Sequence, residues 1–415
     1  MLFINLTMKI MATEKVLNIV SENYPYGTGE QFFDAEVKEL SRYFDKIQLF
    51  PLQKREGLRE LPESVFINDV LAKTPRKISK SQVLKYVFRI LKIVFFEWTR
   101  SDKKVYILKK IKRWTVSIIQ CSILGENFIK EIDLKEENYF YSFWMNDGAL
   151  LLSILRDQNC IEEFNFRVNG FDIFNERQES GYMPFRYYNY SLVNKVFVLS
   201  NEAYNYLHKL NCYPEKLRLS HYGIFENSQN KLKDDQKWRI VSCANVIPLK
   251  RIDKIISALS IIKDKSIVWT HFGDGYLMDD IKEKASKLGD NVHVDLRGNV
   301  LNSEIIETYQ NEPVNLFVHT SETEGLGMAI IEAQSFGIPV VVIGVGGVPD
   351  IVSEATGEVL SPESEGPELA AAIKRVLNSE KNTNEYRTTI QKQIYYKFSA
   401  EKNYEALFQK LITNS

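Results

Sequence analysis

The sequence predicts an α/β protein with two doubly wound, Rossmann-like domains that face each other across a cleft. In both halves of the chain, short apolar segments alternate with segments whose apolar residues recur at helical spacing. Parallel sheets that are covered by helices on both faces produce this alternation. The polar stretch Glu226–Lys237 separates the halves and is typical of a linker. Ligands of such sheets bind beyond the carboxyl ends of the strands, which predicts a site between the domains.

Composition narrows the class of protein. The chain has 415 residues, 53 of them basic and 54 acidic, and 44% are hydrophobic. This mix excludes a mainly disordered chain, and a net charge of −1 argues against broad nucleic-acid binding. The four cysteines form no Cys-x-x-Cys pair and are typical of thiols in a reducing compartment.

The start of the chain resembles neither a signal peptide nor a membrane span. It lacks a basic first segment and a small-residue cleavage site, and no stretch of about 18 charge-free apolar residues occurs. We therefore expect a cytoplasmic protein. Residues 1–14 read as a loose leader, with Met8 or Met11 as the true start.

The first domain is expected over residues 1–225. Its predicted strands are apolar, and they are Val16–Ser21, Lys46–Phe50, Tyr139–Phe143, Phe164–Val168 and Lys195–Leu199. A helix is predicted over Glu30–Tyr43, after a loop that contains Gly27 and Gly29.

A basic helical insert is expected at about residues 71–120. Leu71–Thr115 contains 14 Lys and Arg residues against Glu97 and Asp102, a net charge of +12 that leaves −13 for the rest. Basic amphipathic helices are predicted over Gln82–Trp98 and Lys103–Gln120. Such helices suit an anionic membrane surface, which we expect residues 71–115 to contact. The alternative is a helical pair that packs on the sheet and exposes a solvated basic face.

The second domain is expected over residues 238–398, after a linker at 226–237. Its predicted strands are Arg239–Ala244, Ser266–Phe272, Val292–Leu296, Val314–His319 and Ile338–Ile343. Its predicted helices are Leu249–Ile262, Tyr276–Leu288, Ser303–Gln310 and Gly327–Phe336.

The segment Ser321–Ala333 (SETEGLGMAIIEA) is the strongest candidate site. A strand, a glycine-containing turn and a helix follow one another, so the N–H groups of Gly325–Met328 are unpaired and can bind an anion. Glu324 is expected on the loop before the helix and Glu332 two turns into it, about 12 Å along the axis. A carboxylate can accept hydrogen bonds from two neighbouring hydroxyls. The pair could hold the two sugars of a sugar nucleotide with its diphosphate between them. The alternative is two solvated helix charges.

A second strand–loop–helix segment, Val241–Asp253, places Lys250 at the mouth of the expected cleft. A lysine there supplies a positive point charge for a diphosphate. A solvated basic helix start is the alternative.

These segments resemble the retaining glycosyltransferases of family 4, which have the GT-B fold. EGLGMAIIEA followed by SFGIPVVVIGVGGVPDIV carries the resemblance, which is strongest from Arg239 to Val352. It implies that Glu332 binds the nucleotide ribose and that Glu324 contacts hydroxyls of the donor sugar. It also implies that Lys250 grips the phosphates.

The resemblance also extends to other parts of the donor site. Asn245 stands where the family has an arginine, and Arg251 could compensate. The resemblance implies that further donor contacts come from Gly27, Gly29, Gly273, Val300, Gly325, Leu326 and Gly327.

The segment Arg167–Arg177, followed by Pro184-Phe185-Arg186, is similar to bacterial polysaccharide glycosyltransferases in which a histidine faces the donor sugar. Asn169 occupies that position here. An asparagine can donate and accept hydrogen bonds, so it keeps hydroxyl recognition, but it does not titrate near pH 7. We expect Asn169, Glu324 and Lys250 to carry catalysis.

The resemblance implies a retaining, metal-independent, hexosyltransferase-type enzyme of surface-polysaccharide synthesis, such as that of capsule or lipopolysaccharide. The donor is expected to be a UDP-sugar and the acceptor a glycan or polyprenyl-linked glycan. No Asp-x-Asp follows a strand and the five histidines lack ligand spacing, so no metal site and no cofactor are expected. The enzyme would be cytoplasmic and peripheral to the membrane, and it would not bind nucleic acid. Residues 399–415 would form a helix that crosses back to the first domain.

Two other functions remain open. A non-catalytic GT-B subunit that binds a partner enzyme or glycan would explain Asn169 and Asn245. A sugar-nucleotide epimerase of the same fold would need titratable carboxylates and the expected histidine in the cleft.

Overall fold

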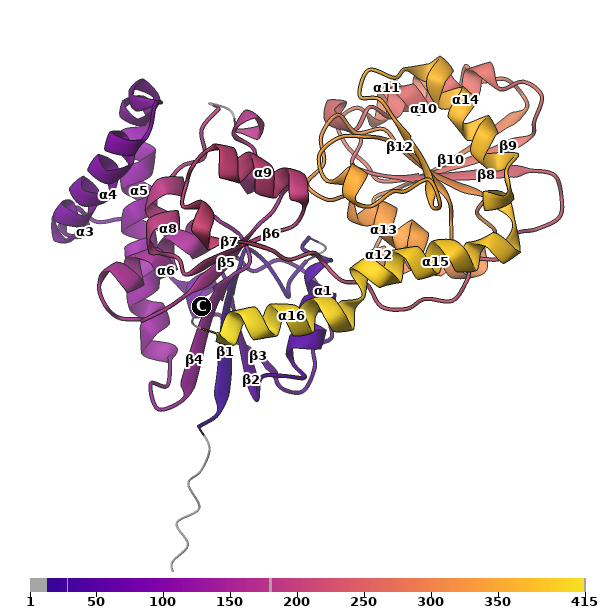
Figure 1. Ribbon diagram of the computed structural model, residues 1–415. Coiled ribbons are helices and arrows are strands. Elements are labelled where there is room, and N and C mark those ends of the chain that lie inside the picture. Colours follow the sequence, from indigo (N-terminus) through magenta and orange to yellow (C-terminus); the bar gives the residue numbers. More distant parts are fainter. Residues whose placement is uncertain (1–12, 28, 179–180, 414–415) are drawn as a thin grey trace, which may run out of the picture.

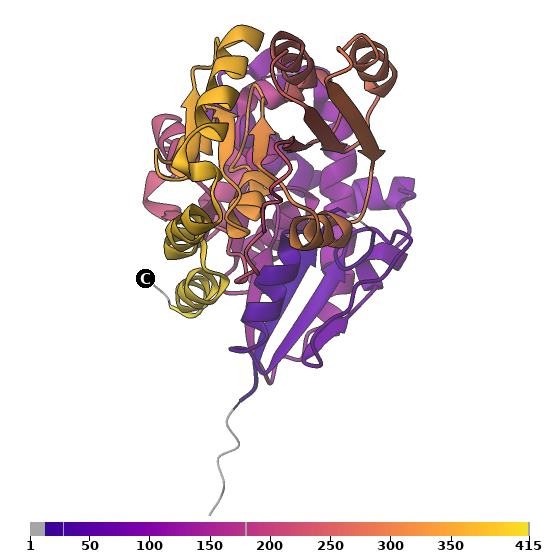
Figure 2. The same ribbon diagram turned by 90° about the vertical axis from the view of Figure 1, so that its right-hand side faces the viewer.

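The computed structural model describes residues 13–27, 29–178 and 181–413. The two candidate start methionines and nearly all of the expected leader fall outside the described residues. Figure 1 and Figure 2 show two α/β domains that face each other, which confirms the predicted fold class.

The N-terminal sheet has seven strands in the order β3-β2-β1-β4-β5-β6-β7, and every neighbouring pair is parallel. The strands are β1 (Lys15–Ser21), β2 (Lys46–Pro51), β3 (Val65–Ile67), β4 (Glu137–Ser142), β5 (Asn165–Val168), β6 (Lys195–Val198) and β7 (Leu217–Leu219). The α-helices outside the insert are α1 (Phe33–Leu40), α6 (Asp147–Asp157), α7 (Gly170–Ile173), α8 (Arg186–Leu192) and α9 (Asn201–Lys209). The helices of the insert are α2 (Val70–Lys73), α3 (Lys80–Lys85), α4 (Val87–Arg100) and α5 (Lys104–Phe128).

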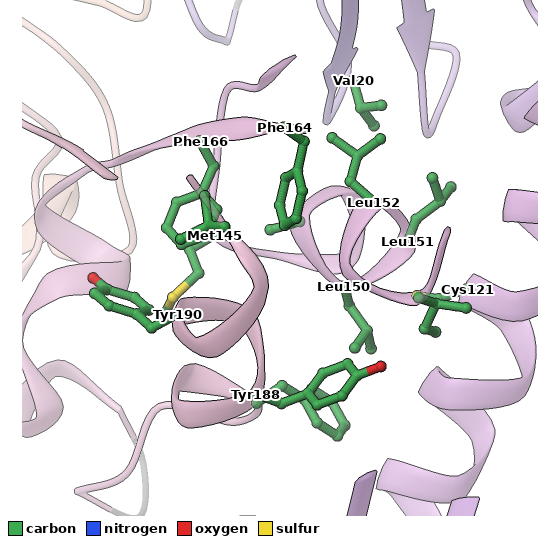
Figure 3. Close-up of a cluster of buried hydrophobic side chains, with 14 of the residues drawn as sticks. Val20, Cys121, Met145, Leu150, Leu151, Leu152, Phe164, Phe166, Tyr188 and Tyr190 are labelled. Atoms are coloured by element: carbon green, nitrogen blue, oxygen red, sulfur yellow. The ribbon is translucent and has the colours of Figure 1, made fainter. Parts of the chain in front are cut away.

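The N-terminal core joins the sheet to both α6 and the insert. Figure 3 shows side chains of α6, among them Leu150 and Leu152, gathered with Phe166 of β5 and Tyr190 of α8. Cys121 of α5 belongs to the same buried cluster. The long helix of the insert is therefore part of the domain core.

The three helices predicted in the N-terminal domain have different limits. The helix expected over Lys103–Gln120 is α5, which continues to Phe128, so the insert is longer than expected. The helix expected over Gln82–Trp98 is two helices, α3 and α4, which meet at Tyr86. The Tyr86 ring is buried there, and its hydroxyl donates to Glu126 Oε1 over 3.0 Å. The helix expected over Glu30–Tyr43 begins only at Phe33, because Glu30 has a positive φ of 57°.

The C-terminal sheet has six parallel strands in the order β10-β9-β8-β11-β12-β13. They are β8 (Trp238–Cys243), β9 (Ile267–Phe272), β10 (Val292–Gly298), β11 (Leu316–His319), β12 (Val340–Ile343) and β13 (Gly357–Leu360). The α-helices are α10 (Ile252–Ile261), α11 (Met278–Ala285), α12 (Asn302–Asn311), α13 (Met328–Ser335), α14 (Gly366–Leu377), α15 (Asn384–Phe398) and α16 (Ala400–Ile412). Single 3-10 turns cover Ile129–Glu131, Asn175–Arg177, Pro214–Lys216, Pro248–Lys250, Val348–Asp350 and Glu380–Asn382. The four residues of β12, all β-branched, are buried, as a central parallel strand requires.

The chain passes between the domains twice, and the two passages lie together. Ile224 N–H donates to Phe398 O over 2.8 Å, and Ala400 N–H donates to Ile224 O over 2.9 Å. After the second passage, α16 packs on α1 of the N-terminal domain, while α15 packs on α13 (Figure 1).

The segment expected as a linker is anchored to the C-terminal domain by one buried side chain. Asn230 is fully buried, and its Nδ2 donates to Tyr309 O and Glu312 O, each over 2.7 Å. Its Oδ1 accepts from Val314 N–H over 3.1 Å. Across the described residues, no helix is both long and apolar enough to span a bilayer.

Candidate functional site

The carboxyl ends of the two sheets meet at a pair of glycines. Gly170 follows β5 and Gly325 follows β11. A Cβ atom on Gly325 would lie 2.9 Å from both the Cα and the N of Gly170, which is closer than real side chains approach. Only glycine allows the two backbones to come so near, so both positions define how the domains meet.

Polar contacts between the domains surround these glycines. Arg177 Nε donates to Thr323 Oγ1 over 3.1 Å. The backbone N–H of Asn201, just after β6, donates to Asp350 Oδ2 over 2.7 Å. Thr323, Asn201 and Asp350 lie in the segments after β11, β6 and β12, at the edge where ligands of such sheets bind. Arg177 ends the 3-10 turn that follows α7.

Glu324 is the centre of the site. It follows β11 and Lys250 follows β8, and because these two strands are neighbours in the sheet, the two side chains form an ion pair. Glu324 Oε1 also lies 2.9 Å from His319 Nε2 and accepts from Ser321 Oγ over 3.1 Å. These contacts all involve one carboxylate oxygen. The other, Oε2, accepts no hydrogen bond from the described residues.

The charge of Glu324 is secured by its neighbours. Burial by itself would raise the pKa of Glu324, but the hydrogen bond from His319 and the charge of Lys250 outweigh it and hold that pKa well below its usual range. The side chains of Lys250 and Glu324 are only 18% and 14% exposed. The site therefore presents a permanent carboxylate with one unused oxygen, beside a lysine.

His319 ends β11 at the cleft, where the sequence predicts a possible ligand contact, and the structure places it against Glu324. Its side chain is 5% exposed, and its ring points a nitrogen at Glu324 Oε1. It lies at the end of a buried strand, a position that many core residues share. Its contact with Glu324 was not predicted, although a spacing of five residues at the same strand end is a signal for it.

The backbone between Glu324 and α13 offers unpaired donors. The N–H groups of Gly325, Leu326 and Gly327 donate no hydrogen bond to the described part of the chain. Gly327 has a φ of 95° and precedes α13, which begins at Met328, one residue later than expected. The first turn of α13 adds the positive end of its dipole to this loop.

Glu332 lies in α13 in an environment that favours its neutral form. Burial raises its pKa to about 7, and a hydrogen bond from Asn302 Nδ2 to Oε1, 3.1 Å long, opposes the shift. Asn302 begins α12, two residues after Val300. Val300 packs against the buried cluster that includes Ile330 and Ile331 of α13. Burial raises the pKa of Cys243, at the end of β8, to about 12, and the nearby Glu332 adds to it. The loop with Val300 and the end of β8 are thus brought to Glu332.

Two of the expected phosphate contacts have different surroundings. Arg251 was expected to assist Lys250, but it has a φ of 46°, and its guanidinium pairs with Glu322 over 2.9 Å, Asp253 over 3.2 Å and Glu365 over 3.5 Å. Three carboxylates therefore engage this arginine. Asn245, by contrast, is exposed, and its side chain makes no hydrogen bond to the described residues.

Gly273 is part of the same edge of the sheet. It follows β9, and its N–H donates to Gly298 O over 2.7 Å. This bond ties the loop after β9 to the loop that leads to Val300.

Asn169 was expected to face the donor sugar, but in this structure its amide is engaged within the N-terminal domain. Oδ1 accepts from the Tyr222 hydroxyl, and Nδ2 donates to Phe143 O over 3.2 Å. The Asp172 carboxylate accepts from the backbone N–H of Asn169, and burial raises the pKa of Asp172 to about 7. The side chain of Asn169 therefore fixes the turn that presents Gly170.

The loop with Gly27 and Gly29 is held by a buried carboxylate. Glu30 accepts from the N–H groups of Asn23 over 2.8 Å and Tyr24 over 2.6 Å, and from Trp144 Nε1 over 2.6 Å. Gly27 and Gly29 both turn their carbonyl oxygens to Arg59, over 3.2 and 2.6 Å. Glu30 was not recognised in the sequence as the anchor of this loop.

A cavity of about 430 Å³ lies between this loop and the turn after Gly170. Trp144, Phe171 and Met183 give it apolar walls, and Glu22 and Asn146 stand at its polar side. Phe171 is the residue after Gly170, so the cavity adjoins the contact with Gly325. No group of three histidine, cysteine, aspartate or glutamate side chains in residues 13–27, 29–178 and 181–413 could hold a metal ion.

Comparison with known proteins finds a family model that matches part of the chain. Residues 224–393 match the family model described as Glycosyl transferases group 1. This segment contains Lys250, Glu324, Glu332 and the loops around them.

The chain is also similar to several curated proteins. It is 30% identical over 162 residues to the sulfoquinovosyl transferase SQD2 of Arabidopsis thaliana, a match that covers 35% of this chain and 30% of that protein. It is 30% identical over 187 residues to the amylovoran biosynthesis glycosyltransferase AmsK of Erwinia amylovora, covering 42% and 46%. A poly(ribitol-phosphate) alpha-N-acetylglucosaminyltransferase of Staphylococcus aureus is 27% identical over 183 residues, covering 43% and 36%. The chain thus spans less than half the length of the curated relatives it matches.

Solved structures share the whole architecture. The structure of TarM superimposes with a TM-score of 0.68 at 14% identity, over 97% of this chain and 99% of that one. HepE of Anabaena, solved in complex with UDP-glucose, gives 0.65 at 13% identity, over 96% and 99%. WaaG, a glycosyltransferase involved in lipopolysaccharide biosynthesis, gives 0.60 at 14% identity, over 96% and 99%. The chain therefore has the two-domain GT-B fold, and its residues 224–393 match the model of the family Glycosyl transferases group 1.

Proposed function

We propose that this chain is a retaining glycosyltransferase that moves a hexose-type sugar from a UDP-sugar to a hydroxyl of a glycan or lipid-linked glycan acceptor, in the synthesis of a surface polysaccharide. The observation that carries the proposal is the pairing of Glu324 with Lys250 beside the unpaired N–H groups before α13. The choice of UDP is supported by the HepE complex with UDP-glucose. The relatives AmsK and WaaG support the pathway by what their names state.

The C-terminal domain would bind the donor. Glu332 accepts hydrogen bonds from the two ribose hydroxyls, and the loop at Val300 lies against the base. The unused oxygen of Glu324 accepts a hydroxyl of the donor sugar. The diphosphate then lies between the two carboxylates, where Lys250 leaves Glu324 to pair with it and the N–H groups of Gly325 to Gly327 donate to it.

The leaving diphosphate gains negative charge as the bond to the sugar breaks. Lys250 and the backbone donors are placed to stabilise that charge without any metal ion, and such preorganised groups supply a large share of catalysis. On the retaining, front-side path, the acceptor hydroxyl approaches from the same face as the leaving phosphate and gives its proton to it. No protein base is then required.

The acceptor would lie on the N-terminal side. The cavity beside Phe171 and Trp144 has the apolar faces on which a sugar ring stacks and the polar groups that bind its hydroxyls. Asn169 acts by holding the turn with Gly170 against Gly325, so that the acceptor meets the donor.

Nucleotide binding tests the donor site. We expect UDP, but not GDP, ADP or CMP, to raise the melting temperature equally with magnesium and with a chelator, and Glu332→Ala to abolish the shift. A ligand at about 100 times its dissociation constant adds about 2.7 kcal/mol, which is easily measured. No shift with any nucleotide would favour the non-catalytic GT-B subunit that Asn245 and Asn169 suggest.

Donor turnover tests the chemistry. We expect the wild type to release UDP from one of UDP-glucose, UDP-galactose or UDP-N-acetylglucosamine in the presence of a polysaccharide acceptor. Glu324→Gln should lower the rate by about 100-fold or more. Glu322→Gln is the matched control, because Glu322 lies two residues away but is 52% exposed and pairs with Arg251. Equal rates in the two variants would refute the assignment, and proton NMR of the product's anomeric centre tests retention.

A further inference from the structure

Helix α4 carries two apolar stripes on opposite sides. The inner stripe includes Ile90 and Ile93, which are buried in the N-terminal core. The outer stripe starts at the end of α3 with Leu84 and continues with Phe88, Leu91 and Phe95, a spacing of four, three and four residues that keeps the side chains on one face. These four side chains are 76%, 84%, 61% and 65% exposed.

Helix α5 adds a second exposed apolar row. Val105, Leu108 and Val116 are 67%, 59% and 38% exposed, on the side opposite to the buried Ile107 and Trp114. Within the described chain, nine of the nineteen large apolar side chains that are exposed lie on α3, α4 and α5. Such a concentration of exposed apolar side chains on one segment marks a surface that contacts a protein or a membrane. We call these nine side chains the apolar stripe: Val83, Leu84, Phe88, Leu91, Phe95, Val105, Leu108, Ile111 and Val116.

Positive charges stand next to the apolar stripe. Lys109 and Lys112 are exposed on the outer side of α5, and neither forms an ion pair with any described residue. Lys85 and Lys92 flank the outer stripe of α4, where they are paired with Glu126 and Asp157. Together with the net charge of +12 over residues 71–115, this arrangement presents an apolar surface with a cationic border.

Helix α4, which carries part of the apolar stripe, is fixed to the N-terminal domain by buried hydrogen bonds. Glu97 of α4 is fully buried, where it accepts from the Tyr188 N–H over 2.7 Å and from the Tyr182 hydroxyl. Figure 1 shows α3, α4 and α5 at the side of the N-terminal domain that is farthest from the C-terminal domain. Docking there leaves the meeting point of the two domains uncovered.

We propose that the apolar stripe docks on the surface of an anionic phospholipid bilayer. Its side chains enter the boundary between headgroups and acyl chains, and Lys109, Lys112 and their neighbours contact lipid phosphates. Charge decides the occupant, because a cationic border around an apolar face complements an anionic bilayer. The proposal goes beyond glycosyl transfer and does not depend on it, since no residue of the stripe belongs to the donor site.

Vesicle sedimentation of the full chain tests the proposal. We expect strong binding to phosphatidylcholine vesicles that contain about 30% phosphatidylglycerol, weak binding to phosphatidylcholine alone, and release by salt. Lys109→Gln with Lys112→Gln should lower the partition coefficient by about 25-fold, since each charge near such a surface contributes a factor of about five. The matched control is Lys282→Gln with Lys287→Gln on the exposed side of α11.

The apolar contribution needs its own variants. Phe88→Ser with Phe95→Ser should reduce binding by at least tenfold, and because both side chains are exposed, folding is expected to survive. Tyr396→Ser is the control, since Tyr396 on α15 is 84% exposed, as Phe88 is. Circular dichroism and thermal unfolding check that each variant remains folded.

Insertion depth provides an independent measurement. Brominated acyl chains should quench the added fluorescence of Phe88→Trp but not that of Tyr396→Trp. Failure of the wild type to sediment, or equal binding by the stripe variants and their controls, would overturn the proposal. So would size-exclusion evidence that the stripe instead joins two copies of this chain.

Discussion

Replacing Glu332 with glutamine should stabilise the ligand-free protein while weakening its binding of UDP. Burial raises the pKa of Glu332 from 4.5 to about 7, so the folded state binds the proton more tightly than the unfolded chain does. The unfolding free energy therefore falls as the pH rises from about 4.5 to about 7 and is level above that range. Glutamine does not titrate, and it can keep the hydrogen bond from Asn302.

The size of the effect follows from the shift. A change from 4.5 to about 7 corresponds to about 3 kcal/mol at pH 8. Glu332 is only partly buried in its surroundings, so solvent screening reduces this to about 2 kcal/mol. Glu332→Gln should thus unfold at higher urea concentration than the wild type at pH 8, and at the same concentration near pH 4.5.

Saturating UDP should make the wild type more stable than Glu332→Gln at pH 8, the reverse of the order without ligand. A carboxylate offers a charged accepting oxygen to each ribose hydroxyl, whereas a glutamine side chain has a single neutral accepting oxygen, so UDP should stabilise the wild type more than Glu332→Gln at pH 8. Wild-type affinity for UDP should also weaken as the pH falls below about 7, because Glu332 then carries a proton. Glu307→Gln, an exposed position on α12, serves as the control. The reasoning fails if Glu332→Gln is no more stable than the wild type at pH 8, or if its stabilisation is equal at both pH values.

Three further changes probe the site and its support. Lys250→Ala removes the cation that pairs with Glu324, and steady-state kinetics should give a kcat about 100-fold to 1,000-fold lower if the lysine stabilises the leaving diphosphate. Gly325→Ala places a methyl group 2.9 Å from Gly170, so the domains meet less closely and steady-state kinetics should give a lower kcat. Asn230→Ala leaves two carbonyl groups and one N–H without their partner, and chemical denaturation should show a loss of about 3 kcal/mol, with unchanged UDP affinity.

The alternation of apolar strands with amphipathic helices was enough to predict both sheets, because a buried parallel strand tolerates little but apolar residues. The short edge strands β3, β7 and β13 were not predicted, since each has only three or four residues and is partly exposed. The break at Tyr86 was also missed, because the partner of its hydroxyl, Glu126, is 40 residues away.

In the candidate site too, features that follow from the strand pattern could be predicted, and contacts between distant parts of the chain could not. Lys250 and Glu324 could be placed together because both follow strands that a doubly wound sheet makes neighbours. The ion pairs of Arg251 could not be predicted, because the left-handed turn at its own residue directs it to Glu365, on another part of the chain. Likewise, the contact of Gly170 with Gly325 depends on how two separate domains meet, which no local pattern records.

The paired passages at Ile224 and Ala400 act as a single pivot. Because both chain crossings lie side by side, a rotation of one domain that pivots elsewhere would have to pull both of them apart. This pivot is coupled to the meeting point of the sheets: Tyr222, two residues before Ile224, bonds to Asn169, which holds the turn with Gly170. A rotation of the domains about these passages would therefore also displace the turn with Gly170, which faces Gly325.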